Sequence, residues 1–417
     1  MKGNLKGSGV RIQTNCRICK SVNLVEFLNL GEQPLANAFL DQQSLDKAEP
    51  KYPLRVAVCV SCGLCQLLDI VAPEVLFRDY IYFSSGMPSS THFQNYAEEI
   101  VSYFLPRKGG LVVEIGSNDG HLLRLIKDTG ADVLGIDPAL NIVEIANKRG
   151  IETIGDFFST DIASKIIKQK GPAQVIIANN VVAHIDDYDD LFEGIRLLLA
   201  EDGVFIFEAP YLMDMFENLA FDTIYHEHLS YLALSPLIRL FPKFGMEIFH
   251  VDIFPVQGNS IRVYAGRYGR RAIRFSVFEL MTKENRMKLK DTATYFALAE
   301  RIKNLKEEVV NLLVQLKKQG KKIYGYGASA KGNTLLNYFS LGPEIIECVT
   351  EELPSKIGLY TPGTRIPIID IREARKNPPD YYFLLAWNYK DAILNKEAEF
   401  LADGRKLIMP VGHTRII

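Results

Sequence analysis

Apolar and polar positions follow two alternating patterns through the middle of the chain. Short apolar runs predict buried strands of a parallel sheet at residues 111–115, 133–136, 175–178 and 204–208. Amphipathic stretches such as 120–129 and 140–149 lie between these runs and predict helices. This strand–helix order is typical of a doubly wound α/β domain.

A long helical pattern precedes a second α/β alternation. Within residues 280–319, one apolar face is predicted to pack against the protein, formed by Tyr295, Leu298, Ile302, Leu305, Val309, Leu312 and Leu316. Further strands are predicted at 322–326, 345–349 and 382–386, and a turn at Gly327 precedes a helix from about Lys331. We therefore expect a small N-terminal domain (1–75), a central α/β domain (76–280), and a helical connector with a C-terminal Rossmann-like α/β domain (281–417).

Composition restricts the partners. The 48 Lys and Arg residues balance 50 Asp and Glu residues, so no basic excess indicates binding to nucleic acid or to an anionic membrane. The apolar runs are far shorter than the roughly 20 residues that span a bilayer, and residues 1–11 lack a signal core. We expect a cytoplasmic protein. The sequence leaves its oligomeric state open, and a monomer is compatible with it.

Four of the six cysteines form two CxxC pairs, Cys16 with Cys19 and Cys59 with Cys62. Each pair places two thiolates on one tight turn, and two pairs supply the four soft ligands that tetrahedral zinc prefers. In a reducing compartment this spacing favours a structural zinc site over disulfides; free thiols in a small core are the alternative. Cys65 is expected to be buried on a strand at 64–68.

The first central strand ends in a turn formed by Glu114, Gly116, Asn118, Asp119 and Gly120. Gly116 lets the backbone approach a ligand closely, at the strand end where open α/β sheets bind ligands. The turn is not a G-x-G-x-x-G pyrophosphate loop. A weaker demand for phosphate binding fits S-adenosylmethionine (SAM), which has no phosphate.

The ends of the next three strands extend this pattern. Asp137 follows the turn by about twenty residues and can accept hydrogen bonds from ribose hydroxyls. Asp156 and Phe157 can meet the adenine amino group and ring, and Asn179 and Asn180 can contact the methionine part. The spacing resembles that of class I SAM methyltransferases, and an NAD-binding fold is the alternative.

A candidate acid–base cluster lies at residues 225–228, Tyr-His-Glu-His. A neutral histidine beside a carboxylate can act as a general base near pH 7, and the spacing is not that of an H-E-x-x-H metalloprotease. His184 follows the fourth strand, and the phenols of Tyr80 and Tyr82 can donate to a developing oxyanion. The alternatives are a solvated polar loop, a core histidine and aromatic packing.

Together these motifs resemble the zinc-binding sugar C-methyltransferases of deoxysugar biosynthesis. The resemblance runs from about Cys16 to Trp387 and is carried by both CxxC pairs and by residues 80–85, 180–184, 221–231, 325–334 and 386–388. It implies SAM and structural zinc as cofactors, and a reaction at a carbon beside a ketone of a nucleotide-linked sugar.

The resemblance also implies roles for individual residues. His228 would remove the α-proton, and Tyr225 and Glu227 would position that base or the sugar. His184 and one of the two tyrosines in the 80–85 motif would act at the keto oxygen, because an α-proton is acidic only when the enolate oxygen is stabilised. The enolate carbon would then attack the sulfonium methyl group.

In that family the C-terminal domain binds the nucleotide, here of a dTDP- or GDP-linked keto sugar. The helix N-terminus after the Gly327 turn would meet the diphosphate, although an ordinary structural turn is the alternative. The chain has Thr350-Glu351-Glu352 where the family tends to carry Asp, and Gly258-Asn259-Ser260 where it often has Gly-Gly-Ser. The implied residues are Gly327, Ala328, Lys331, Gly332, Asn333, Thr334, Glu351, Trp387 and Asn388.

Two other functions compete with a sugar C-methyltransferase. One is an NAD-dependent nucleotide-sugar dehydrogenase or epimerase, against which the missing G-x-G-x-x-G argues. The other is a non-catalytic protein that binds SAM or a nucleotide sugar, against which the histidine and tyrosine cluster argues.

Overall fold

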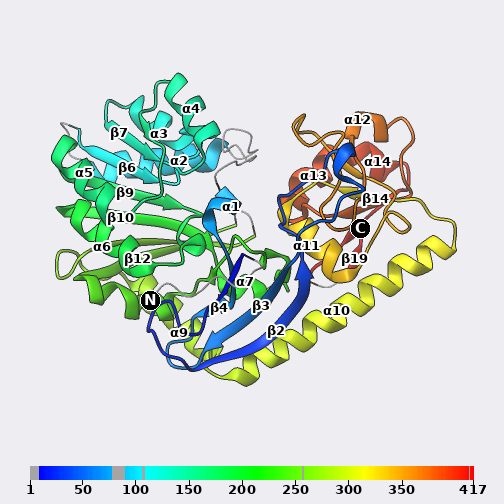
Figure 1. Ribbon diagram of the computed structural model, residues 1–417, viewed down its shortest axis with the longest axis horizontal. Helices are drawn as coiled ribbons and strands as arrows, with labels where there is room; N and C mark the ends of the chain where they lie inside the picture. The colour runs from blue at the N-terminus through cyan, green and yellow to red at the C-terminus, as the bar shows by residue number, and fades with distance from the viewer. Residues whose placement is uncertain (1–8, 78–89, 106–108, 256–257, 413) are drawn as a thin grey trace.

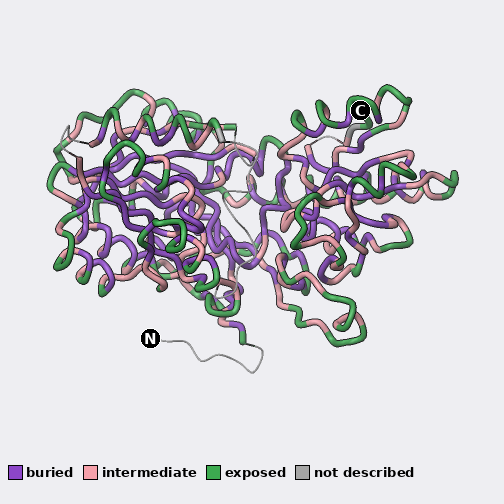
Figure 2. The backbone as a smooth tube through the Cα atoms, turned by 90° about the horizontal axis from the view of Figure 1, so that it is seen from above, coloured by how far each residue is buried: buried purple, intermediate pink, exposed green. Residues whose placement is uncertain are grey.

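The computed structural model describes residues 9–77, 90–105, 109–255, 258–412 and 414–417. Two α/β lobes lie side by side, and an N-terminal sheet runs beneath them together with one long helix (Figure 1). Buried backbone extends through the interiors of both lobes, and exposed segments lie at their outer edges (Figure 2). The α/β fold class with a small N-terminal domain is confirmed.

The N-terminal part is a four-stranded antiparallel sheet in the order β11-β4-β3-β2, beside a β1–β5 pair. The final strand, β11, comes from the central lobe, where Ser230 pairs with Gln66 and Tyr231 pairs with Cys65. Cys65 is buried on β4, as predicted. The elements are β1 (Val10–Ile12), β2 (Leu24–Gln33), η1 (Gln42–Ser44), β3 (Tyr52–Cys59), β4 (Cys65–Leu67), β5 (Asp69–Val71), α1 (Pro73–Phe77) and β11 (Ser230–Tyr231).

The central lobe is a seven-stranded sheet in the order β12-β13-β10-β9-β6-β7-β8, in which β13 alone runs antiparallel to its neighbours among the described strands. Its strands are β6 (Leu111–Ile115), β7 (Asp132–Ile136), β8 (Thr153–Ile154), β9 (Ala173–Asn179), β10 (Leu199–Pro210), β12 (Met246–Phe254) and β13 (Ser260–Arg267). The four apolar runs that predict strands lie on β6, β7, β9 and β10. They are almost continuously buried because helices cover both faces of the sheet.

The helices of the central lobe include the two amphipathic segments predicted at 120–129 and 140–149, which are α3 and α4. They are α2 (Ser90–Phe104), α3 (His121–Lys127), α4 (Leu140–Lys148), α5 (Thr160–Lys170), η3 (Val182–His184), α6 (Tyr188–Leu198), α7 (Leu212–Glu217), η4 (Phe221–Thr223), α8 (Leu234–Leu240), η5 (Phe241–Phe244) and α9 (Phe275–Arg286).

The prediction of one helix over 280–319 is wrong in one respect, because the helical structure is interrupted between α9 and α10 (Thr292–Lys318). Lys288 adopts a left-handed φ of 54°, and the Asp291 side chain accepts a hydrogen bond from the Ala293 N–H as the N-cap of α10. The predicted apolar face is buried, except that Leu313 takes the place expected for Leu312. Helix α10 continues to the C-terminal lobe (Figure 1).

The C-terminal sheet has the order β16-β15-β14-β17-β18-β19. The strand predicted at 345–349 is wrong, because the N–H groups of Ile345 and Ile346 close a turn on the Gly342 carbonyl and the strand begins at Val349. The elements are β14 (Ile323–Tyr326), α11 (Ala330–Phe339), β15 (Val349–Glu351), β16 (Ile368–Asp370), α12 (Ile371–Ala374), β17 (Tyr381–Leu384), η6 (Trp387–Tyr389), α13 (Lys390–Lys396), α14 (Ala398–Ala402), β18 (Lys406–Met409) and β19 (Arg415–Ile416).

Among the described residues, no helix combines the length and the apolar character needed to cross a bilayer.

Candidate active site

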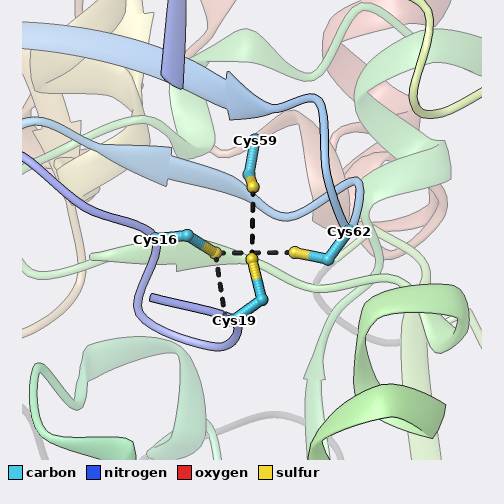
Figure 3. Close-up of side chains that lie close together, drawn as sticks. All are labelled: Cys16, Cys19, Cys59 and Cys62. Carbon is cyan, nitrogen blue, oxygen red and sulfur yellow. Dashed lines mark hydrogen bonds between the residues drawn. The ribbon is translucent and has the colours of Figure 1, made fainter. Parts of the chain in front are cut away.

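The four paired cysteines converge on one point. Their Sγ atoms all lie within 4.8 Å of one another, with 3.5 Å between Cys16 and Cys62 and 3.5 Å between Cys19 and Cys59 (Figure 3). Tetrahedral zinc with Zn–S bonds of about 2.3 Å needs sulfur atoms at about this spacing. Four thiolates complete the coordination shell, so the cluster fits a structural zinc ion and leaves no position for a substrate.

Each CxxC pair lies in a tight turn that is closed by the backbone N–H of the residue following the pair. The Lys20 N–H donates to the Cys16 carbonyl, and the Gly63 N–H donates to the Cys59 carbonyl at 2.7 Å. Both residues have a positive φ, 62° at Lys20 and 86° at Gly63. Two similar turns therefore present the two pairs.

A cavity of about 1180 Å³ opens between the central and C-terminal lobes and is also lined by the N-terminal part. The predicted SAM-binding residues that line it are Glu114, Gly116, Asn118, Asp137, Asp156, Phe157, Asn179 and Asn180. The other two, Asp119 and Gly120, are not part of its lining. The Asp119 carboxylate pairs with Arg149 at 2.7 Å, and a Cβ on Gly120 would meet Ile151 at 2.9 Å, so both residues support the turn from behind.

The turn after β6 has room only for glycine at its start. Gly116 has a φ of 68°, and a Cβ there would lie 2.3 Å from the Val181 Cγ2 atom. The Gly116 N–H donates to the Ile136 carbonyl at 2.7 Å, which holds the turn against β7. The backbone can therefore line the cavity directly.

Buried polar atoms at the strand ends fit a ligand with several hydrogen-bonding groups. Asp137 accepts bonds from the Asn118 and Ala139 N–H groups, both at 2.9 Å, and each carboxylate oxygen retains a lone pair for a hydroxyl. Glu114 Oε2 and the side-chain oxygens of Asn179 and Asn180 are buried without a hydrogen-bond partner among the described residues. Burial raises the pKa of Asp137, and raises that of Glu114 well above its usual range. The amino and hydroxyl groups of SAM, which donate hydrogen bonds, suit these acceptor atoms.

His228 lies on the cavity wall as an oriented, neutral imidazole. Its Nδ1–H donates to the Thr223 carbonyl at 2.7 Å, which leaves the lone pair on Nε2, where the Tyr225 hydroxyl donates at 2.9 Å. Burial lowers the pKa of His228 well below its usual range, and the neighbouring charge of His184 lowers it further. The base form is therefore the resting form near pH 7.

His184 also lines the cavity, and its ring stacks on the Phe77 ring at 5.6 Å and lies tilted against the His228 ring at 4.9 Å. Burial lowers the pKa of His184 to about 4. Its Nε2 atom is buried and has no hydrogen-bond partner among the described residues. Tyr80 and Tyr82 lie outside the described residues.

The other two members of the 225–228 cluster point away from the cavity lining. His226 is buried and donates through Nε2 to the Pro53 carbonyl at 3.2 Å. Glu227 accepts a hydrogen bond from the Asn37 Nδ2 atom at 2.6 Å, and Asn37, not Glu227, lines the cavity. Asn37 is not among the residues that the sequence predicts, because it lies in a loop that carries no recognisable motif.

Some of the predicted nucleotide-site residues line the cavity and others do not. Gly327, Ala328, Lys331, Glu351 and Asn388 line the cavity. The Ala328 N–H donates to Glu351 Oε2 at 3.0 Å, so the carboxylate that replaces the expected Asp contacts the turn directly.

The remaining predicted nucleotide-site residues are not part of the cavity lining. The Asn333 side chain donates to the Ala36 carbonyl at 2.7 Å, and the Trp387 indole N–H donates to Asp222 at 2.6 Å. Gly332 packs against Leu385, where a Cβ would lie at 2.7 Å, and Thr334 is buried on α11. These side chains join the three parts of the chain or complete the core.

Two lysines add positive charge to this wall of the cavity. Lys331 lies 5.3 Å above the Trp387 ring, and Lys356, which the sequence does not predict, donates to the Ala328 carbonyl at 2.7 Å. Burial lowers the pKa of both side chains. Half-buried cations beside a glycine turn and a helix N-terminus suit an anionic ligand.

Comparison with known proteins identifies all three parts. A zinc binding domain family matches residues 16–77, a methyltransferase domain family matches 90–251, and the C-methyltransferase C-terminal domain family matches 255–412. The C-methyltransferase NovU of Streptomyces niveus is 36% identical over 410 residues, which cover 98% of each chain.

Solved structures resemble part of the chain weakly. The PH0226 protein of Pyrococcus horikoshii OT3 has a TM-score of 0.35 and 15% identity, covering 45% of this chain and 94% of its own. Magnesium protoporphyrin IX methyltransferase (ChlM) from Synechocystis PCC 6803 with bound SAM has a TM-score of 0.32 and 14% identity, covering 42% and 80%. The full-length identity to NovU and the three family matches place the chain in the family of zinc-binding, SAM-dependent C-methyltransferases.

Proposed function

We propose that this enzyme methylates a carbon next to the ketone of a nucleotide-linked 4-keto-deoxysugar, in cytoplasmic deoxysugar biosynthesis, with His228 as the base. The observation that carries the proposal is one continuous cavity that contains the turn after β6, the His228 and Tyr225 side chains, and the turn after β14. A methyl donor, a reacting sugar and a nucleotide can each contact a different wall of this cavity.

The side chains of the central lobe are suited to removing the α-proton of the sugar. The lone pair on His228 Nε2 takes the α-proton once the Tyr225 hydroxyl rotates aside, and the Thr223 carbonyl stabilises the resulting imidazolium through Nδ1–H. The electrons of the C–H bond form an enolate. His184 Nε2, for which the described part of the chain offers no hydrogen-bond partner, can donate to the enolate oxygen in its N–H tautomer. The positive charge of Lys331 favours the same anion.

SAM supplies an electrophilic methyl group. When bound, SAM would supply its sulfonium methyl group to the enolate carbon, with the carbon–sulfur bonding pair left on sulfur. Asp137, Glu114, Asn179 and Asn180 would hold the ribose and methionine parts of SAM, so that the methyl group faces the sugar.

The C-terminal lobe would bind the nucleotide diphosphate. The Gly327 turn begins α11, whose N-terminal N–H groups and the Lys331 and Lys356 side chains face the cavity. Glu351 at the end of β15 occupies the position where α/β folds commonly bind ribose hydroxyls.

The test uses dTDP- and GDP-linked 4-keto-6-deoxy sugars with SAM, with product mass and NMR as readouts. We expect a mass gain of one methylene and a new carbon–carbon bond beside the ketone. His228→Asn should abolish turnover and leave the affinity for SAM unchanged, because the imidazole contacts the sugar and not the cofactor. Near-normal turnover by this variant would refute the assignment of the base.

A further inference from the structure

The segment between β2 and β3, residues 34–51, is an arm that leaves the N-terminal sheet and lies against the C-terminal lobe (Figure 1). Leu40 forms a bridge with Tyr360, and the Tyr360 hydroxyl donates to Gln42 at 2.5 Å. The Gly363 N–H donates to the Glu49 carboxylate at 2.8 Å. Contacts along its length therefore hold the arm in one position.

At the base of the arm, two side chains from different lobes fix residues 36 and 37. The Asn333 side chain on α11 donates to the Ala36 carbonyl at 2.7 Å. Glu227, beside the proposed base, accepts from Asn37 Nδ2 at 2.6 Å. The backbone is held from one side and the side chain from the other, so the Asn37 amide is restrained on the cavity wall.

The bond to Glu227 also sets the orientation of the Asn37 amide. An ionised carboxylate only accepts hydrogen bonds, so it selects the orientation in which Nδ2 faces Glu227 and Oδ1 faces elsewhere. A primary amide has two N–H donors and an acceptor oxygen, and Glu227 uses one donor. A hydroxyl or ketone beside the reacting carbon is the kind of group that the others can bind.

We propose that Asn37, delivered by the N-terminal arm, contacts the substrate at the methyl-transfer site and hydrogen-bonds an oxygen of the sugar ring near the reacting carbon. This proposal rests on the proposed function. Glu227 then acts through Asn37 as a positioning residue, although the motif at 225–228 suggests that it contacts the sugar itself. The zinc-binding part thereby contributes to recognition of the substrate as well as to the fold.

Exchanging the amide and the carboxylate between positions 37 and 227 tests whether Asn37 contacts the substrate or only supports the fold. In Asn37→Asp two carboxylates face each other and one must take up a proton. In the double variant Asn37→Asp/Glu227→Gln, the Gln side chain donates to the new carboxylate and the contact is restored with its polarity reversed. A purely supporting role predicts recovery of activity in the double variant.

Contact with the substrate predicts a different result. The double variant should regain its melting temperature and its affinity for SAM, while kcat/KM for the sugar remains lower by about 10- to 100-fold, the usual effect of leaving a buried hydrogen-bonding group unpaired. Asn37→Ala should show a similar loss, together with slower exchange of the sugar α-proton in deuterated solvent. Gln42→Ala removes one exposed contact of the same arm and leaves the contacts of Leu40, Glu49 and Ala36 in place, so it is the matched control and should behave as wild type.

Each outcome decides between the alternatives. Recovery of full activity by the exchanged pair, or activity of Asn37→Ala within twofold of wild type, overturns the role of Asn37 while the proposed function stands. If wild type methylates none of the keto sugars, the proposed function fails, and the role of Asn37 fails with it.

Discussion

Replacing Gly116 by alanine should test whether the turn after β6 is as tightly packed as its geometry indicates. Two costs arise. The φ of 68° is left-handed, which costs a non-glycine residue about 1–2 kcal/mol. The new Cβ would also lie 2.3 Å from Val181 Cγ2, and overpacking of this kind costs about 1–3 kcal/mol. Gly116→Ala should therefore lower the free energy of unfolding by about 2–5 kcal/mol.

A second substitution separates the two costs. Val181→Ala removes the clashing methyl group, and the nearest remaining contact, with the Val181 Cβ, would be an ordinary 3.6 Å. In that background Gly116→Ala should cost only the strain of about 1–2 kcal/mol. Gly130→Ala is the matched control, because Gly130 has a φ of 93° and no atom within 4 Å of the added Cβ.

Urea unfolding without ligand, followed by circular dichroism, measures all of these variants. An equal cost of Gly116→Ala in the wild-type and Val181→Ala backgrounds would refute the packing argument. A cost no greater than that of Gly130→Ala would do the same.

Three further perturbations have definite expected outcomes. Cys62→Ser should abolish zinc binding, measured by mass spectrometry of the bound metal, and destabilise the N-terminal part, whereas Cys348→Ala should retain one zinc per chain. Burial lowers the folded-state pKa of His184 to about 4 from its ordinary 6.5, so the neutral ring stabilises the fold fully above pH 6.5. The free energy of unfolding should therefore fall by about 3 kcal/mol as the pH is lowered to 4, and urea unfolding of His184→Phe should lack this decrease. Trp387→Phe deletes the donor to buried Asp222 and should lower the unfolding free energy by about 1–3 kcal/mol, and an unchanged value would contradict this.

Periodicity predicts the central strands well because strands buried on both faces are nearly continuous apolar runs. It fails where local geometry decides the structure. The break before α10 depends on the positive φ of Lys288 and the cap at Asp291, and neither changes the apolar pattern of the helix. Ile346 is apolar and buried, as a strand residue would be, but it lies in a turn and not in a strand.

The candidate site divides along a similar line. Residues at strand ends, such as Asp137 and Asn180, are predictable because parallel strands bring their carboxyl ends to one edge of the sheet. Asn37 and Lys356 have no such signal, because tertiary packing alone places them there. Asn37 and Glu227 are 190 residues apart in sequence, and neither neighbourhood indicates the other.

The segment of the central lobe that carries the proposed base is attached to both other parts of the chain. Asp222 accepts a hydrogen bond from Trp387 of the C-terminal lobe, Glu227 accepts one from Asn37 of the arm, and β11 adds Ser230 and Tyr231 to the N-terminal sheet. His228 lies between the second and third of these attachments, and its ring is oriented by the Thr223 carbonyl on the same segment. Loss of any one attachment should therefore shift the same imidazole. This gives a physical reason for the zinc-binding part and the C-terminal lobe to remain fused to the seven-stranded sheet, although that sheet already carries the turn proposed to bind SAM.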